Sequence, residues 1–219
     1  MRLFQPILPG AHAADRLLAC LGAACGIAFA ALVSTLLPLQ AGDVPLLVAP
    51  LGASAVLVFA VPASPLAQPW PVIGGNTLSA LVGIAVYHLL PSEPALAASV
   101  AVGGAILAMS LLRCLHPPGG ASALTAVIGS PAVHAAGFGF AFLPVALNSV
   151  SLVAAGLLFH RFSRHSYPHR PAPAPAAGFH LADIDAALED MHESFDISRA
   201  DLDALLSRAE LHAAQRKGR

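Results

Sequence analysis

The sequence has very little charge. Only 11% of its 219 residues are acidic or basic, whereas about 25% is usual for a soluble domain, and 57% are hydrophobic. Between Leu17 and His160 the only acidic or basic residues are Asp43, Glu93 and Arg113. This composition excludes an ordinary soluble domain over that stretch and is typical of a membrane protein, and no nucleic-acid partner is expected.

Cysteines and catalytic motifs are also scarce. The three cysteines are odd in number and lack metal-ligand spacing, which argues against a disulfide framework and a metal site. There is no His-Glu-x-x-His, no Gly-x-Ser-x-Gly and no pair of acids within an apolar run. We therefore expect no enzyme, no catalytic residues, no metal and no cofactor.

Long apolar runs dominate instead. They cover residues 17–37, 44–61, 72–90, 95–112, 116–128 and 138–159, and the second and fifth are broken by Pro and Gly. The first run has the roughly 20 residues that a helix needs to cross a hydrocarbon core of about 30 Å. It exceeds the apolar region of a signal peptide, so we interpret it as a retained helix. The fold class predicted is an all-α, polytopic helical membrane protein with two broken, half-helix segments.

The chain divides into a membrane domain and a tail. Residues 1–170 form the predicted transmembrane domain, and the PAPAPAAG stretch at 171–178 is an extended linker. Residues 179–219 carry apolar side chains at helical spacing, and Ser198 with Asp201 resembles a capping box between two helices. Because such a short tail buries little core alone, we expect a cytoplasmic helical hairpin that pairs with a second protomer, as a homodimer, or docks on another domain.

The membrane domain contains an internal repeat. PLGASAVL at 50–57 matches PGGASALT at 118–125 in five of eight positions, and Asn76 is echoed by Asn148. The repeat halves are 17–90 and 95–160.

The basic residues predict the orientation. Arg2 and Arg16 precede the first run and three arginines between 161 and 170 follow the last, so both termini are expected in the cytoplasm. If the broken segments cross, there are six crossings, the repeat is inverted and Arg113 lies near the cytoplasm. If they dip and return, there are four and Arg113 lies outside. We favour six.

The two breaks predict an anion site. Unpaired backbone at membrane depth is tolerated only beside protein or a water-filled cavity, and helices starting at Gly52 and Gly120 would aim free amides and partial positive charge into the interior. The candidate binding residues are Gly52, Ala53, Ser54, Arg113, His116, Gly119, Gly120, Ala121 and Ser122, with Asn76 and Asn148 in a second tier.

Structural alternatives remain for these candidates. Arg113 is costly in a membrane, and it is either functional or an interfacial topology anchor. His116 either binds solute and relays protons or caps the preceding helix. Ser54 and Ser122 either contact the anion or bond their own backbone, and the two asparagines are the kind of residue that forms hydrogen bonds between membrane helices.

LHPPGGASAL at 115–124 resembles the HPP family of integral membrane proteins, and so does APLGASAVLVFAVPASPLAQPWPVIGGNTLSALVG at 49–83. The tail segment IDAALEDMHESFDISRADLDALL at 184–206 is similar to the segment that joins HPP domains to cytoplasmic CBS domains in bacterial members. No CBS domain follows, which indicates either a short bacterial form or a truncated chain.

The resemblance implies a function. Plant and cyanobacterial relatives are associated with nitrite transport, and the family is usually described with four spans. We therefore expect a transporter or channel for a small inorganic anion, nitrite first, in a bacterial inner membrane, with membrane lipid as its surroundings. The alternative is a membrane sensor or scaffold that signals through the helical tail.

Overall fold

The computed structural model describes residues 13–36, 45–163, 165–173, 181–191 and 195–217, and within these ranges every regular element is a helix. In chain order they are α1 (Ala13–Leu36), α2 (Pro50–Ala60), η1 (Pro65–Ala67), η2 (Pro71–Gly75), α3 (Asn76–Leu89), α4 (Pro94–Leu111), α5 (Pro117–Ile128), α6 (Pro131–Ala136), η3 (Ala141–Ala146), α7 (Leu147–His160), α8 (Leu181–Met191) and α9 (Arg199–Lys217). η1 is a 3-10 turn, and η2 and η3 are π-helical turns that lead into α3 and α7. The all-α prediction is confirmed.

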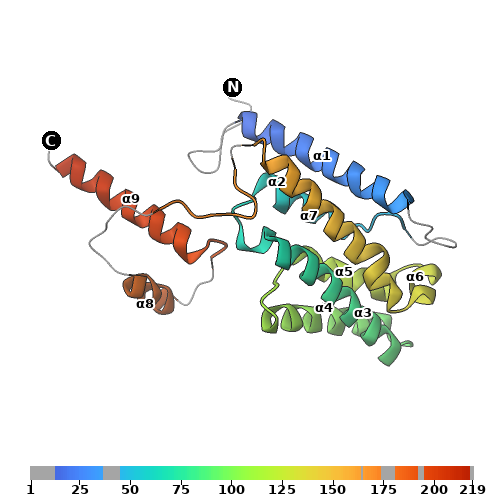
Figure 1. Cartoon of the computed structure of the whole chain (residues 1–219). Coiled ribbons are helices and arrows are strands. Elements are labelled where there is room, and N and C mark those ends of the chain that lie inside the picture. The colour runs from blue at the N-terminus through green and yellow to red at the C-terminus, as the bar shows by residue number, and fades with distance from the viewer. Residues whose placement is uncertain (1–12, 37–44, 164, 174–180, 192–194, 218–219) are drawn as a thin grey trace, which may run out of the picture.

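Helices α1 to α7 form one bundle, and α8 and α9 lie beside it (Figure 1). Among the described residues, four helices are long and apolar enough to cross a membrane: Ala14–Leu36, Pro71–Leu89, Pro94–Leu111 and Ala141–His160. Half of the most apolar stretch of Pro71–Leu89 and 44% of that of Ala141–His160 are buried within the protein, against 22% for Ala14–Leu36 and for Pro94–Leu111. The chain is thus a membrane protein with α3 and α7 inside the bundle and α1 and α4 on its outside.

Prolines determine where the short helices begin. α2 starts at Pro50 and α5 at Pro117, so the predicted starts at Gly52 and Gly120 were wrong by two and three residues. Proline suits the first helical turn because its φ is already helical and the N–H that it lacks would have no intrahelical partner there. With 11 and 12 residues, α2 and α5 are about 16 and 18 Å long, which is less than a hydrocarbon core.

α2 and α7 run in the same direction, antiparallel to α1. Near the start of α7, the side-chain oxygen of Asn148 accepts a hydrogen bond from Val48 N at 3.0 Å, and its amide donates to Ser34, near the end of α1, at 2.9 Å. At the other end of α7, His160 Nε2 lies 2.9 Å from the carbonyl oxygen of Val58 in α2. The chain from Val48 onward therefore runs back toward the end of the bundle at which α1 begins.

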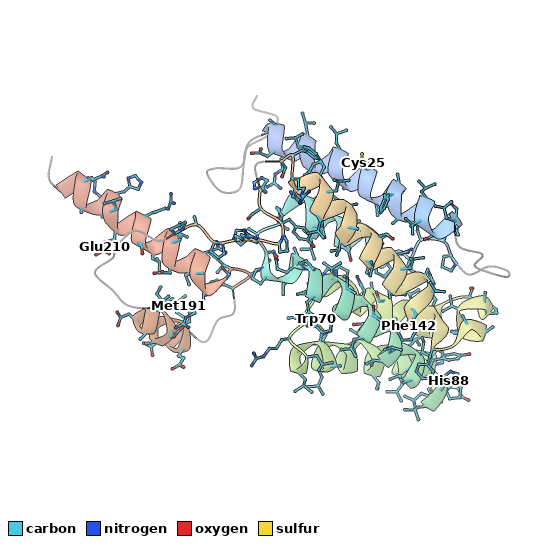
Figure 2. The ribbon with its side chains drawn as sticks, viewed as in Figure 1. Cys25, Trp70, His88, Phe142, Met191 and Glu210 are labelled. Carbon is cyan, nitrogen blue, oxygen red and sulfur yellow. The ribbon has the colours of Figure 1, made fainter. Side chains whose placement is uncertain are left out.

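α5 runs alongside α3 in the same direction. Trp70 (labelled in Figure 2) immediately precedes η2, and it donates through Nε1 to the carbonyl oxygen of Leu112, the residue that follows α4, at 3.2 Å. Gly119 in the first turn of α5 lies against Ser79, and Ala123 farther along lies against Gly83. The end of α4 and the start of α5 thus lie beside the first half of α3, and the later residues of α5 lie beside the end of α3.

The contact between α3 and α5 depends on glycine. A Cβ added to Gly83 would lie 2.4 Å from the carbonyl oxygen of Ala123 and 2.8 Å from the Cβ of Ala126. Both neighbours belong to the helix itself and cannot rotate away, so only a residue without a side chain allows this approach.

The tail forms two helices, as predicted, in its described part. Ser198 caps α9, because its Oγ accepts from Asp201 N at 3.1 Å and its carbonyl oxygen accepts from Leu202 N at 2.9 Å. Of the predicted linker at 171–178, residues 174–178 lie outside the described residues, as do 179, 180, 192–194, 218 and 219 of the tail.

We expect Gly83→Ala to destabilise the protein by about 2 kcal/mol, because the added methyl overpacks backbone against backbone. Gly103→Ala is the matched control: Gly103 lies inside α4, a Cβ there meets nothing within 4 Å, and the change should stabilise by up to about 1 kcal/mol. Denaturation in detergent micelles measures both, and equal effects of the two substitutions would contradict the close contact.

Candidate functional site

Five buried polar side chains meet where α2, α3, α5 and α7 come together, and we call them the Asn76 cluster: Ser54, Asn76, His116, Ser122 and Ser149. Asn76 Nδ2 donates to Ser54 Oγ at 3.1 Å and lies 3.3 Å from Ser149 Oγ, while its Oδ1 accepts from Ser122 Oγ at 2.9 Å. One side chain on α3 therefore binds three other helices, which confirms the prediction that this asparagine forms interhelical hydrogen bonds.

His116 closes the cluster toward η1. Its Nδ1 lies 2.8 Å from the Leu66 carbonyl oxygen, and its Nε2 lies 2.8 Å from Ser54 Oγ. Because a carbonyl oxygen only accepts, Nδ1 carries the hydrogen, and in the neutral ring Nε2 accepts from the Ser54 hydroxyl. A directed chain of hydrogen bonds thus runs from Asn76 through Ser54 and His116 to the backbone of η1.

One hydroxyl at the edge of the cluster has no partner among the described residues. Ser79 lies one turn beyond Asn76 on α3, is 0% exposed and makes no hydrogen bond there. Its Oγ lies next to Gly119, 2.7 Å from the position that a Cβ would take. An unpaired buried hydroxyl costs about 1–3 kcal/mol, so it calls for an explanation.

The transmembrane region of the HPP family matches residues 9–168. The chain belongs to the HPP family. It is similar to a transmembrane protein of Dictyostelium discoideum, 40% identical over 126 residues that cover 56% of this chain and 44% of the relative. A second transmembrane protein of that organism is 39% identical over 120 residues, 53% of this chain and 38% of the relative. The chain thus spans less than half the length of these relatives. No solved structure matches it.

The His-Pro-Pro motif of this HPP chain offers few backbone amides. Pro117 and Pro118 have no N–H, and Gly119 N already donates to the His116 carbonyl oxygen at 2.8 Å. At the start of α2 the amides of the two residues after Pro50 are likewise bonded to preceding carbonyl oxygens, at 3.0 and 3.1 Å. The donors that face the interior here are side chains and not helix-end amides.

Arg113 ends α4 and lies apart from the cluster. Its φ is +54°, its side chain is exposed, and its N–H donates to the Ser110 carbonyl oxygen at 3.3 Å while Cys114 N donates to that of Met109 at 2.9 Å. These two bonds form a Schellman motif in which Arg113 occupies the left-handed position usually held by glycine. The backbone, and not the guanidinium, makes the contacts that the structure describes.

The remaining predicted residues separate into two groups. Ser54, His116, Ser122 and Asn76 are brought together, and Gly119 touches the edge of their cluster. Gly52, Ala53 and Ala121 are exposed, Gly120 is half-buried with only Val102 within 4 Å of the place that a Cβ would occupy, and Asn148 belongs to a separate contact with Ser34 and the backbone before α2.

Sequence reasoning missed three participants: Ser149, the Leu66 carbonyl oxygen, and Ser79, whose hydroxyl has no partner among the residues that the structure describes. Ser149 follows Asn148 directly, but its role depends on which face of α7 meets α3. A backbone carbonyl such as that of Leu66 has no sequence signal at all.

The Ser54–His116 pair has the spacing of a nucleophile and its general base. Both side chains are 0% exposed, so a substrate does not reach the hydroxyl in this arrangement. The expectation that the protein is not an enzyme stays a prediction.

Proposed function

We propose that the chain is a membrane transporter or channel for a small inorganic anion, nitrite first, and that the anion binds at the Asn76 cluster and Ser79. The observation that carries the proposal is the fully buried Ser79 hydroxyl, which has no partner within the described part of the chain and lies beside a cluster rich in hydrogen-bond donors. Such a donor suits a solute that is bound for part of a cycle and absent for the rest.

The chemistry of the cluster suits an anion. Its members carry hydroxyl and amide donors and no carboxylate, and these donors bond one another or nearby backbone until an anion takes their place, while Ser79 adds a hydroxyl with no partner among the described residues. An anion that entered would exchange its hydration for these donors, which act strongly where water is excluded. His116 is the titratable member of the cluster and would serve as the proton partner if transport is coupled to protons.

The proposal places the anion on side chains and not on the helix-end amides expected from the sequence. The amides at the starts of α2 and α5 are replaced by prolines or bonded to nearby carbonyl oxygens. The two starts still meet, because Ser54 in α2 lies within hydrogen-bond distance of His116, which immediately precedes α5.

We also propose that the membrane domain is an inverted repeat with six crossings. Each half has a long helix, a short proline-started helix, and a π-helical turn leading into another long helix. α2 runs antiparallel to α1, and α5 runs parallel to α3 and so away from the end where α4 stops. These directions favour six crossings over four. Each short helix then crosses the membrane together with the extended chain next to it, and it does not dip in and return to the same side.

The setting of the molecule is part of the same proposal. Both termini face the cytoplasm of a bacterial inner membrane, because Arg2 precedes α1, Arg16 lies in its first turn, and three arginines between 161 and 170 follow α7. A homodimer remains a prediction that rests on the apolar side chains of the tail, such as the half-exposed Met191 and Phe195.

A sensor or scaffold is the second candidate, and one observation favours it. The tail is hydrogen-bonded to the membrane domain through Ser64 and Asp196, at 2.8 Å. If reconstituted protein carries no anion while the tail still controls the membrane domain, this candidate replaces transport.

Cysteines placed at Glu93, Arg113 and His165 of a cysteine-free protein should report the topology to a membrane-impermeant reagent. With six crossings, positions 113 and 165 react from one side of the membrane and position 93 from the other. Four crossings would instead put 93 and 165 on one side and 113 on the other, which would contradict the proposal.

Proteoliposomes should take up nitrite faster than empty vesicles, and Ser79→Ala should slow that uptake by about tenfold or more, since one hydrogen bond to a charged solute is worth about 1.5–3 kcal/mol. The variant loses no hydrogen bond that the structure describes, so the fold should survive. Ser99→Ala is the matched control, because Ser99 is exposed on α4 and its hydroxyl donates to the Ala95 carbonyl oxygen of its own helix.

Arg113→Gly provides a second comparison. It removes the charge and places glycine, which adopts the left-handed conformation without steric cost, at the end of α4. It should keep the uptake rate. Comparison of nitrite with nitrate, formate and chloride ranks the solutes. Uptake no faster than through empty vesicles would contradict transport, and unchanged uptake in Ser79→Ala would contradict the site.

A further inference from the structure

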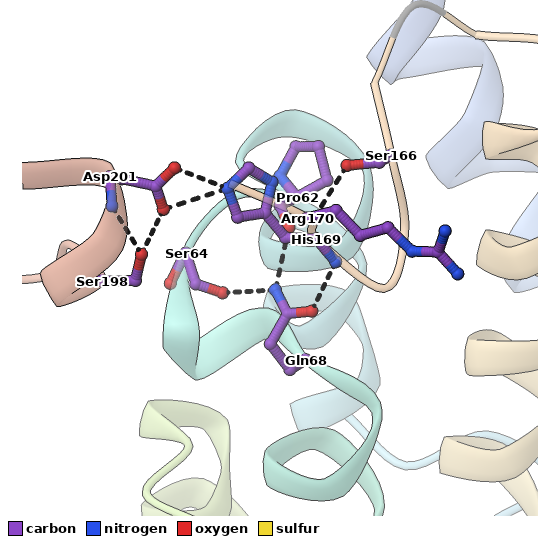
Figure 3. A network of polar contacts seen from close by, with 8 residues as sticks. All are labelled: Pro62, Ser64, Gln68, Ser166, His169, Arg170, Ser198 and Asp201. Atoms are coloured by element: carbon purple, nitrogen blue, oxygen red, sulfur yellow. Dashed lines mark hydrogen bonds and ion pairs between the residues drawn. The ribbon is translucent and has the colours of Figure 1, made fainter. Parts of the chain in front are cut away.

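The tail docks on one loop of the membrane domain, residues 61–70, which connects α2 to η2 (Figure 3). Ser64 Oγ donates to Asp196 Oδ1, just before α9, at 2.8 Å. Gln68 accepts from His169 N at 2.8 Å and donates to the Pro62 and Ser64 carbonyl oxygens at 2.9 and 2.8 Å. The loop is therefore folded on itself and bonded to the chain that leads to the tail.

His169 and the capped end of α9 hold this contact together. His169 Nε2 lies 2.8 and 3.0 Å from the two carboxylate oxygens of Asp201, and Ser198 Oγ donates to the same carboxylate. Partial burial acts to raise the pKa of Asp201, but the hydrogen bonds from Ser198 and His169 and the charge of His169 outweigh it and lower that pKa. The carboxylate is thus held ionised at the helix N-terminus, where negative charge is favoured.

A third contact lies between the two. Tyr167 is buried, which raises the pKa of its phenol, and it donates to the Ala67 carbonyl oxygen at 2.9 Å. The segment after α7 therefore contacts the C-terminal end of η1 through Tyr167. At the N-terminal end of η1, Asp196 accepts a hydrogen bond from the hydroxyl of Ser64.

The same loop holds His116. Ser64 Oγ accepts from Leu66 N at 3.1 Å while donating to Asp196, so a single hydroxyl joins the tail to η1. The Leu66 carbonyl oxygen then accepts from His116 Nδ1 at 2.8 Å. Three successive hydrogen bonds thus lead from the carboxylate of the tail to the histidine of the buried cluster.

We propose that the tail is a latch on the site: docked at Ser64 and His169, it fixes η1 so that the Leu66 carbonyl oxygen holds His116 on Ser54, and its release frees the histidine and opens the Asn76 cluster. The inference rests on the proposed function only for the identity of the solute. The coupling itself needs only that docking of the tail and the position of η1 depend on each other.

The physical basis is the weakness of η1 alone. A three-residue 3-10 turn has little hydrogen bonding of its own, so its geometry depends on Ser64, Gln68 and the tail. His116 has a different environment: it is fully buried and packed against Gly75, whose Cβ would lie 2.6 Å from that of His116. Movement of the loop therefore changes the partner of Nδ1 more easily than movement of the histidine backbone does.

The test uses the full chain in lipid nanodiscs and two latch variants, Asp196→Ala and the double variant Asp196→Ala/His169→Ala, followed by amide hydrogen exchange. We expect exchange at Leu66 and Ala67 to rise about tenfold or more, within the usual range of coupling between sites. A rise at Gly119, whose N–H bonds the carbonyl oxygen of His116, should accompany it. Asp190→Ala, the same change on the exposed face of α8, is the matched control.

Each outcome decides the proposal. Faster exchange confined to α8 and α9, or no change in either variant, would overturn the latch. Exchange that spreads to Leu66 and Gly119 supports it even where wild-type vesicles carry no nitrite, which is the result that removes the proposed solute alone. Where nitrite does pass, the latch variants should raise its uptake severalfold. Unchanged uptake with faster exchange at Leu66 and Gly119 would overturn the claim that release of the tail opens the Asn76 cluster.

Discussion

The pairing of Asn76 is the interaction on which the rest of the structure depends. An amide inside an apolar bundle is costly unless both its oxygen and its nitrogen are bonded, and here the partners come from α2, α5 and α7. To deliver them, two short helices must reach the interior beside α3, and their prolines let them start there without orphaned N–H groups. The close glycine contacts between α3 and α5 follow from the same requirement.

Much of this architecture was predictable from the sequence, because it depends on the length of the apolar runs and on the few polar residues within them. The apolar runs correspond to helices, and the isolated asparagines are bonded between helices, since few other arrangements satisfy an amide in such surroundings. The helix starts were misplaced because glycine was given more weight than proline. Arg113 was assigned to the site because it is a lone charge. In the structure it occupies a left-handed position at a helix end, and that backbone conformation cannot be predicted from the residue type.

Other parts of the site had no sequence signal. The cluster includes Ser149 and ends on the Leu66 carbonyl oxygen, and both depend on how α7 and η1 are placed against α3. Docking of the tail depends on Ser64 and His169, two ordinary polar residues more than one hundred positions apart. Membership of the HPP family defines the membrane domain, whereas the solute and the role of the tail depend on the contacts of these particular side chains.

The central claim is that the Asn76 cluster binds the solute, and protection of a cysteine at position 54 tests it most directly. In a chain whose other cysteines are replaced, Ser54→Cys should react slowly with a small thiol reagent, because the site opens only transiently, and nitrite should slow the reaction further. A reaction rate that nitrite leaves unchanged would contradict the claim, as would a cysteine that never reacts in protein that transports.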